Sequence, residues 1–226
     1  MEGAPVSPFD PFGWLARFIP ERRLHHLLRA GGVILFGAFL VLRLRQYQSF
    51  LLKPLWAAET AIFATLLLAY VVRTEPRERS RGVKEILLPL AVAALPFALL
   101  ATPPSPAVTA RRPLLLAVFW AMTLSSTLTA WGIWTLRRSF SITVEARDLV
   151  TEGPYRWVRH PVYLGEVLSA AIVTTWRPSL ANGALLALFA GLQLYRSRLE
   201  ERKLALAFPE AYPSWAHRTW WLWRER

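Results

Sequence analysis

Six apolar runs constrain the fold of this chain more than any other feature. They cover residues 30–42, 54–72, 86–102, 113–136, 161–176 and 178–195. A helix needs about 20 mostly apolar residues to cross the hydrocarbon core of a bilayer, which is about 30 Å thick. We therefore predict an all-α fold, a polytopic transmembrane helix bundle with about six spans. The hydrophobic content of 54% agrees with this class.

The last two runs are the least regular. Residues 161–176 would form only about 24 Å of helix at a rise of 1.5 Å per residue. Only Arg177 and Pro178 form the turn to the next run, so these helices either cross fully or form a hairpin inside the membrane. After Tyr195 charged and apolar residues mix as far as Pro209. This pattern predicts a helix that leaves the membrane and continues into a C-terminal cytoplasmic helical cap.

Basic residues divide the connecting segments into two groups. The net charge is +12, and most of the 27 Lys and Arg residues lie in segments 1–29, 73–85, 137–160 and 196–226. Cytoplasmic loops carry an excess of Lys and Arg, so we expect these segments and both termini in the cytoplasm. The excess of arginine over lysine favours a bacterial inner membrane. Membrane lipids are expected partners and nucleic acid is not, because soluble nucleic-acid-binding proteins are rarely this apolar.

The segment GPYRWVRHPVYLGE, residues 153–166, places charged and aromatic side chains at the start of an apolar helix. Pro161 is suited to the first helical position, so Arg156, Arg159 and His160 would lie at a helix N-terminus. Such an N-terminus favours a bound anion. Tyr155 adds an aromatic face and a hydroxyl group. Two interpretations stay open: a site for a zwitterionic ligand, or a basic loop held by anionic lipid.

Carboxylates mark further candidate sites. Glu166 lies one turn inside the fifth run, near Arg159 and His160, whereas Glu59 is expected near the opposite side of the membrane. Carboxylates within a membrane usually face a cavity or a partner. Arg196 and Glu200 are four residues apart and share one helix face. They form either a surface ion pair or a site in which the carboxylate binds a ribose or a cation and the arginine binds a substrate anion.

Metal and thiol chemistry have little support in the sequence. The chain has no cysteine, so thiolate ligands and cysteine nucleophiles are absent. His25 and His26 are adjacent but lack a third ligand, and we predict no metal site. No G-x-G-x-x-G or P-loop motif suggests a soluble type of nucleotide-binding fold. The sequence gives no signal for the oligomeric state.

Two motifs together resemble a known enzyme family. They are ARDLVTEGPYRWVRHPVYLGE and, some 30 residues later, RSRLEERKLALAFPEAY. The pattern, over about residues 136–215, resembles the isoprenylcysteine carboxyl methyltransferase family and the related phospholipid N-methyltransferases. The resemblance implies an integral membrane methyltransferase that uses S-adenosylmethionine and takes a lipophilic substrate through a lateral opening. Together with the apolar runs, it divides the chain into a cytoplasmic or interfacial segment (1–29), four transmembrane helices (30–136) and a cofactor-binding methyltransferase core with the last two membrane helices and the cap (137–226).

The resemblance also implies roles for individual residues. The implied cofactor-binding residues are Arg147, Leu149, Val150, Tyr155, His160, Pro161, Val162, Tyr163, Gly165, Glu200 and Glu201. Arg196 matches the position that binds the substrate carboxylate, and Arg159 is a second candidate for substrate binding. The catalytic candidates are Arg196 and Glu166, of which Glu166 would take a proton from an amine substrate. Arg147 stands where the eukaryotic carboxyl methyltransferases tend to have histidine, and Pro209 replaces a usual glycine.

The sequence is compatible with three classes of function. The leading one is methylation of an isoprenylcysteine-like carboxylate or another lipid acid, and its close alternative is methylation of a phospholipid amine. A membrane reductase of the sterol-reductase type, which would bind NADPH, is an enzyme of another class. A non-enzymatic lipid-binding scaffold or transporter is the third, although the sequence lacks the paired broken helices of repeat-built transporters.

Overall fold

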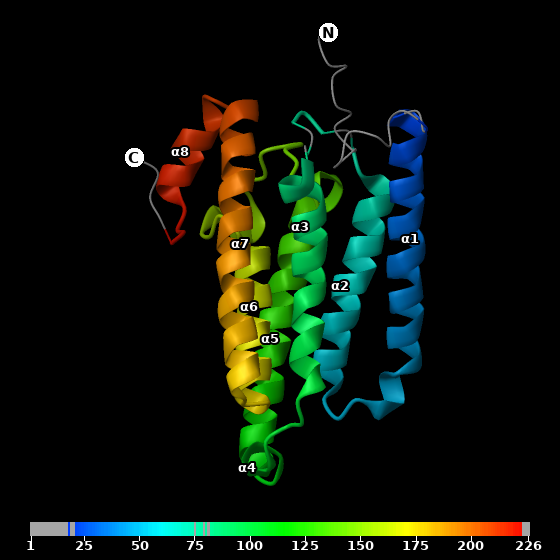
Figure 1. The fold of residues 1–226 in the computed structure, drawn as a ribbon, viewed down its shortest axis with the longest axis vertical. Coiled ribbons are helices and arrows are strands. Elements are labelled where there is room, and N and C mark those ends of the chain that lie inside the picture. The colour runs from blue at the N-terminus through cyan, green and yellow to red at the C-terminus, as the bar shows by residue number, and fades with distance from the viewer. Residues whose placement is uncertain (1–17, 19–20, 75, 79, 81, 223–226) are drawn as a thin grey trace.

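The computed structural model describes residues 18, 21–74, 76–78, 80 and 82–222, which form a bundle of nearly parallel helices (Figure 1). The long elements are α1 (Glu21–Arg45), α2 (Lys53–Val72), α3 (Gly82–Ala94) with η3 (Leu95–Ala101), α5 (Arg112–Leu136), α6 (Pro161–Trp176) and α7 (Leu180–Ala207). The short ones are η2 (Tyr47–Ser49), α4 (Pro106–Thr109), η4 (Arg137–Ser139), η5 (Gly153–Arg156) and α8 (Ala211–Arg218). The described residues form no β-sheet, and the predicted all-α helix bundle is confirmed.

Three helical stretches of the described chain are long and apolar enough to cross a membrane. They are Lys53–Val72, Gly82–Ala101 and Arg112–Ser139. The other predicted spans coincide with α1, α6 and α7, and the count of six stays a prediction. These three helices are not among the stretches that are long and apolar enough to cross, for different reasons. Helix α6 has only 16 residues, whereas α1 and α7 carry many charged residues beside their apolar turns.

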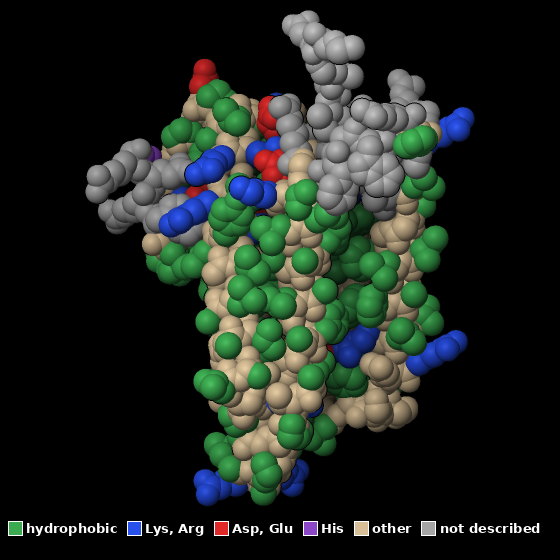
Figure 2. All heavy atoms as spheres, in the orientation of Figure 1, with side chains coloured by type: hydrophobic (Ala, Val, Ile, Leu, Met, Phe, Trp, Pro, Cys, Tyr) green, Lys and Arg blue, Asp and Glu red, His purple; other side chains and the backbone are tan. Residues whose placement is uncertain are grey.

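The two ends of the bundle differ in composition. We call the end that carries residues 137–160 and α8 the loop end, and the end that carries η2, α4 and the α6–α7 turn the turn end (Figure 1). Acidic and many basic side chains gather at the loop end, and hydrophobic side chains cover the flank between the ends (Figure 2). This distribution is that of a protein whose middle lies in hydrocarbon.

Helix α5 lies at the centre of the packing, between α2 on one side and α6 on the other. The α5–α6 contact is close because Gly165 faces α5. A Cβ atom on Gly165 would lie 2.3 Å from Thr129 Oγ1 and 2.9 Å from the Ser125 carbonyl oxygen. Small residues at such an interface let two helix backbones approach each other in a membrane. Ser125 Oγ and Ser169 Oγ, 2.8 Å apart, add a hydrogen bond across it.

Replacing Gly165 by alanine is expected to destabilise the protein by about 1–3 kcal/mol, because the new methyl group overpacks the α5–α6 contact. The matched control is Gly191→Ala on α7, where a Cβ atom would meet nothing within 4 Å. Thermal unfolding in detergent measures both variants. Equal melting temperatures for Gly165→Ala and the wild type would contradict the close contact, and Gly191→Ala is expected to match or exceed the wild type.

A buried asparagine joins η3 to the α6–α7 turn. The two N–H groups of Asn182 Nδ2 are shared among three acceptors, which are the Leu99 carbonyl oxygen at 3.1 Å, Thr102 Oγ1 at 2.7 Å and the Arg177 carbonyl oxygen at 2.8 Å. Ser179 caps the start of α7 by accepting from the Asn182 backbone N–H. These bonds fix the turn between α6 and α7, so the two helices pack side by side with η3 against them.

Candidate functional site

A cavity of about 470 Å³ runs from the loop end into the bundle. We call its charged part the polar end, which is lined by Glu145, Arg147, Asp148, Tyr155, Arg159, His160, Tyr163, Glu166, Arg196 and Glu200. We call the part that α1, α2, α3 and η3 line the apolar arm. It is lined from α1 and α2 by Leu35, Phe36, Phe39, Ile62, Phe63 and Leu66, and from α3 and η3 by Leu90, Ala93, Ala94 and Phe97. One continuous cavity therefore joins ionisable groups to hydrocarbon side chains.

The loop that precedes α6 is held in place by local geometry and by the C-terminal segment. Gly153 has a φ of 56°, a left-handed conformation that glycine adopts without strain. Trp215 Nε1 on α8 donates a hydrogen bond of 2.9 Å to the Tyr155 carbonyl oxygen. The backbone N–H of Trp220 donates to the Trp157 carbonyl oxygen at 2.7 Å. These contacts hold His160 at the N-terminus of α6, where the Pro161 ring begins the helix.

Glu200 lies at the centre of the polar groups from α6 and α7. The Tyr163 hydroxyl group donates a hydrogen bond to Glu200 Oε1. Arg196 Nε lies 3.5 Å from the same oxygen, and His160 Nδ1 lies 4.0 Å from Glu200 Oε2. The Arg196 guanidinium stacks over the Tyr163 ring at 4.8 Å, and its Nη2 donates to the Ile142 carbonyl oxygen at 2.6 Å. Arg196 is thus held in one orientation by three neighbours.

The adjacent carboxylate, Glu201, has a different environment. Glu201 Oε1 accepts from Arg159 Nη1 at 3.1 Å and lies 3.0 Å from His160 Nε2. Glu201 is buried and does not line the cavity. Successive residues on a helix point in directions about 100° apart, so only Glu200 of the pair faces the cavity. Glu201 instead orients the His160 ring, which stacks parallel to the ring of Tyr163.

Glu166 lines the cavity one turn inside α6. Its carboxylate accepts a hydrogen bond from the Nε2 amide of Gln193 on α7. Gln193 is almost fully buried. A carboxylate in this position can accept a proton or a hydrogen bond from a ligand that occupies the cavity.

The structure brings most of the sequence-predicted site residues to one cavity. Those that line it are Arg147, Leu149, Val150, Tyr155, Arg159, His160, Val162, Tyr163, Glu166, Arg196 and Glu200. Pro161, Gly165 and Glu201 lie outside the lining, in the start of α6, the α5–α6 contact and the ion pair with Arg159. Arg156 is exposed and stacks on Trp157. The ligand-binding and catalytic roles of all these residues stay predictions.

Two other predictions concern residues away from this cavity. Glu59 pairs with Arg43 near the turn end, in agreement with the expectation that it does not join the polar end. The side chain of His25 lies outside the described residues. Among the described residues no group of three His, Asp or Glu side chains could hold a metal ion.

Sequence reasoning missed Glu145, a buried carboxylate at the polar end. Glu145 Oε2 lies 2.9 Å from Arg73 Nη2 and 2.5 Å from Arg147 Nη2. Ser141 Oγ donates to the same oxygen at 3.1 Å, and Ser80 Oγ donates to Oε1 at 3.3 Å. Glu145 therefore ties α2 and the segment before α3 to the loop after α5. The one signal for Glu145 in the sequence is that it is an acid within a basic segment, and no periodic pattern marks it.

The charges around Glu145 control its ionisation. Burial alone would raise the pKa of its carboxyl group, but the Arg147 and Arg73 guanidiniums outweigh burial and hold the pKa below its ordinary value of 4.5. A carboxylate with a lowered pKa stabilises the fold above its unfolded-state pKa, and that stability is lost as the pH falls through the folded-state pKa. At neutral pH this ion cluster is therefore fully charged.

Glu145→Gln is expected to lower stability by about 3 kcal/mol at neutral pH, because buried Arg147 and partly buried Arg73 lose their counter-charge. The difference in melting temperature between wild type and variant is expected to shrink as the pH falls below the unfolded-state pKa of about 4.5, and to disappear once the pH is below the lower pKa of folded Glu145. Thermal unfolding in detergent, from neutral to acidic pH, measures this difference. A constant difference across the range would show that Glu145 does not act through its charge.

The polar end is built mainly by one continuous stretch of chain, which runs from α5 through the loop to α6 and α7. Residues 115–207 match the isoprenylcysteine carboxyl methyltransferase (ICMT) family. The predicted resemblance is confirmed. The matched residues include the Gly-Pro-Tyr loop, the Arg-His-Pro start of α6 and the Glu200–Glu201 pair. The family match supports a membrane methyltransferase. Helices α1, α2 and α3, which supply the apolar arm, lie outside the matched residues.

One curated relative is similar over a shorter segment. The chain is 44% identical over 72 residues to the cobalt-zinc-cadmium resistance protein CzcN of Cupriavidus metallidurans. The alignment covers 31% of this chain and 33% of that protein, so the chain spans about a third of the length of the relative. No solved structure matches the chain.

Proposed function

We propose that the protein is an integral membrane methyltransferase that uses S-adenosylmethionine to methylate a lipophilic acceptor. The observation that carries the proposal is the single cavity, in which the ICMT-like polar end continues into the apolar arm. The acceptor we favour is a carboxylate, as in an isoprenylcysteine or another lipid acid. The proposed location is a bacterial inner membrane, with the loop end and both termini in the cytoplasm.

The residues at the polar end fit S-adenosylmethionine. Among the described residues, buried Arg147 Nη1 has no hydrogen-bond partner, and such a donor suits the carboxylate of the methionine moiety. Glu200 offers carboxylate oxygens to a ribose hydroxyl or an ammonium group. The rings of Tyr155 and Tyr163 line the same space and can face a cation. When bound, the cofactor would supply a methyl group activated on a sulfonium.

The protein residues would then act by binding and orienting the acceptor. Arg196, which Tyr163, Glu200 and Ile142 hold in place, would bind an acceptor carboxylate as a fixed donor. Arg159 is the second candidate, although its Nη1 already donates to Glu201. The apolar arm would bind the tail and exclude water. Holding two reactants in attack geometry can account for much of a rate enhancement without a further catalytic group.

An amine acceptor is the alternative within the same chemistry, and Glu166 is the observation that favours it. This carboxylate lines the cavity and could take the proton that an attacking amine must lose.

Calorimetry with S-adenosylhomocysteine and NADPH on detergent-purified protein tests the proposal. We expect micromolar binding of S-adenosylhomocysteine and none of NADPH. Transfer of a labelled methyl group into a membrane lipid extract, followed by alkaline hydrolysis, then separates a base-labile ester from a stable amine product. Folded protein that binds NADPH instead would favour the reductase, and folded protein that binds neither would favour the scaffold.

A further inference from the structure

The apolar arm opens through the side of the bundle. Leu35 on α1, Leu90 on α3 and Phe97 on η3 all line the cavity. They are also exposed, at 51%, 46% and 60%. Side chains that both line a cavity and face outward mark its mouth, and these three place it between α1 and α3. Figure 2 shows this face hollowed between the two helices. A mouth here faces hydrocarbon, so a lipid tail could enter from the side.

Two stacked rings line the arm from α1 and α2. Phe39 on α1 and Phe63 on α2 both line the cavity. Their ring centroids are 5.2 Å apart and their planes differ by 16°. Both side chains are partly buried, so the pair fills the space between α1 and α2. A stacked pair of this kind is a rigid surface for an incoming tail.

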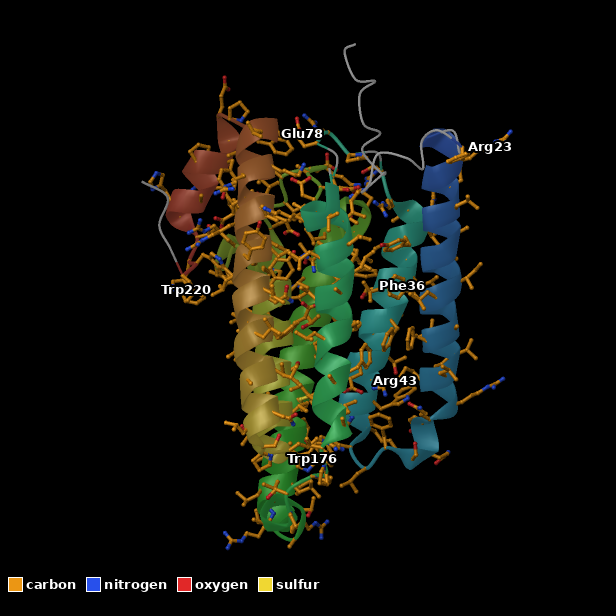
Figure 3. All side chains as sticks on the ribbon, viewed as in Figure 1. Arg23, Phe36, Arg43, Glu78, Trp176 and Trp220 are labelled. Atoms are coloured by element: carbon orange, nitrogen blue, oxygen red, sulfur yellow. The ribbon has the colours of Figure 1, made fainter. Side chains whose placement is uncertain are left out.

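A charged layer lies one helical turn beyond the rings. Arg43 follows Phe39 by four residues on α1, and Glu59 precedes Phe63 by four residues on α2. Each charged residue therefore lies on the same helix face as the phenylalanine of its helix. The two form an ion pair. The Arg43 guanidinium also stacks over the Phe50 ring at 4.6 Å, and Trp56 Nε1 donates to the Arg43 carbonyl oxygen at 2.7 Å. Figure 3 shows Arg43 between α1 and α2 in the half of the bundle nearer the turn end.

We propose that the stacked pair Phe39–Phe63 is the floor of the apolar arm and sets the longest acceptor tail that the protein accepts. The rings stop the tail, and the Arg43–Glu59 ion pair beneath them keeps α1 and α2 together and makes deeper entry unfavourable. Hydrocarbon that passed the rings would separate or desolvate a partly buried ion pair, which is energetically unfavourable. The inference rests on the proposed lipophilic acceptor, but it concerns helices outside the ICMT match.

The floor can be tested by photolabelling that does not depend on methyl transfer. The probes are N-acetyl-S-prenylcysteines with geranyl, farnesyl or geranylgeranyl tails, each with a diazirine at the end of the tail. They are incubated with protein in nanodiscs, irradiated, and mapped by mass spectrometry with unlabelled probe as competitor. We expect saturable labelling of peptides that contain Phe39 or Phe63 by the tail that reaches the floor, and weaker labelling by longer tails.

The decisive variant is Phe39→Ala combined with Phe63→Ala. Removing the floor is expected to increase competable labelling by the longest tail about tenfold or more, since an apolar pocket discriminates one tail extension by about that factor. Ile34→Ala is the matched control, because Ile34 is an exposed residue of α1 that does not line the cavity. Two results would overturn the proposal. One is the same tail preference in wild type and double variant, and the other is labelling spread over the lipid-facing helices.

Binding of S-adenosylhomocysteine, measured in parallel, separates this inference from the proposed function. Unchanged binding in the double variant would show that its polar end is intact, so an altered tail preference comes from the arm. If the wild type bound no S-adenosylhomocysteine but its Phe39 and Phe63 peptides were labelled only by tails up to a certain length, the methyltransferase proposal would be wrong and the proposed floor would be supported. If the wild type bound S-adenosylhomocysteine but its Phe39 and Phe63 peptides were not labelled, only the proposal about the floor would be wrong.

Discussion

Replacing Glu200 by glutamine is expected to weaken S-adenosylhomocysteine binding by about 10- to 100-fold, which corresponds to one lost charged hydrogen bond of about 1.5–3 kcal/mol. Glu200 is the carboxylate of the Glu200–Glu201 pair that faces the cavity, and it contacts Tyr163, Arg196 and His160. Glutamine keeps the size of the side chain and can still accept from the Tyr163 hydroxyl group. It removes the negative charge that would bind a hydroxyl or ammonium group of the cofactor.

Calorimetry of wild type, Glu200→Gln and Glu210→Gln measures this effect. Glu210 is an exposed acid beyond the end of α7, so its replacement controls for the change in net charge. The melting temperatures of both variants should stay within a few degrees of wild type, because Glu200 is only partly buried. Equal affinities of Glu200→Gln and wild type for S-adenosylhomocysteine would show that the charge of Glu200 does not contribute to cofactor binding.

Replacing Arg196 by lysine is expected to lower methyl transfer, as kcat/KM, by about 100-fold, the effect of losing one preorganised donor at a reacting group. The guanidinium stacks on Tyr163 while Nη2 donates to Ile142 and Nε faces Glu200. A lysine keeps the charge but not this planar set of donors, so the substitution is not conservative. Binding of S-adenosylhomocysteine should change much less, because Glu200 remains.

Transfer of a labelled methyl group into a membrane lipid extract measures the rate, and calorimetry measures cofactor binding on the same samples. Arg198→Lys is the matched control, since Arg198 lies on the same helix and is exposed. A loss of cofactor binding equal to the loss of rate would place Arg196 in the cofactor site instead of the acceptor site. Unchanged rates in Arg196→Lys would contradict its role in orienting the acceptor.

Much of the local architecture could be predicted from the sequence. Pro161 begins α6, as expected for a residue that lacks a backbone N–H, and the helix after Tyr195 ends at Ala207, just before Pro209. The apolar runs at 54–72, 86–102 and 113–136 correspond to the three helical stretches that are apolar enough to cross a membrane. These features depend on residues close together in the chain, so their pattern is visible without a structure.

Other features depend on how helices are rotated and packed against one another. The motif contains two adjacent glutamates, and only the rotation of α7 decides that Glu200 faces the cavity while Glu201 pairs with Arg159. Gly165 lies within the same motif, yet the structure places it against α5, where its missing side chain permits close contact. Residues that are neighbours in the chain thus have different physical roles.

The sequence by itself determined the all-α membrane bundle, the ICMT-like motifs and the group of ionisable residues that they contain. Only the tertiary structure decided that Glu145 joins that group and that α1, α2 and α3 complete the cavity with an apolar arm. The physical reason is that apolar periodicity and helix signals act over a few residues. Arg73, which pairs with Glu145, and Phe39, which stacks on Phe63, come from other segments of the chain, and their meeting depends on how whole helices pack.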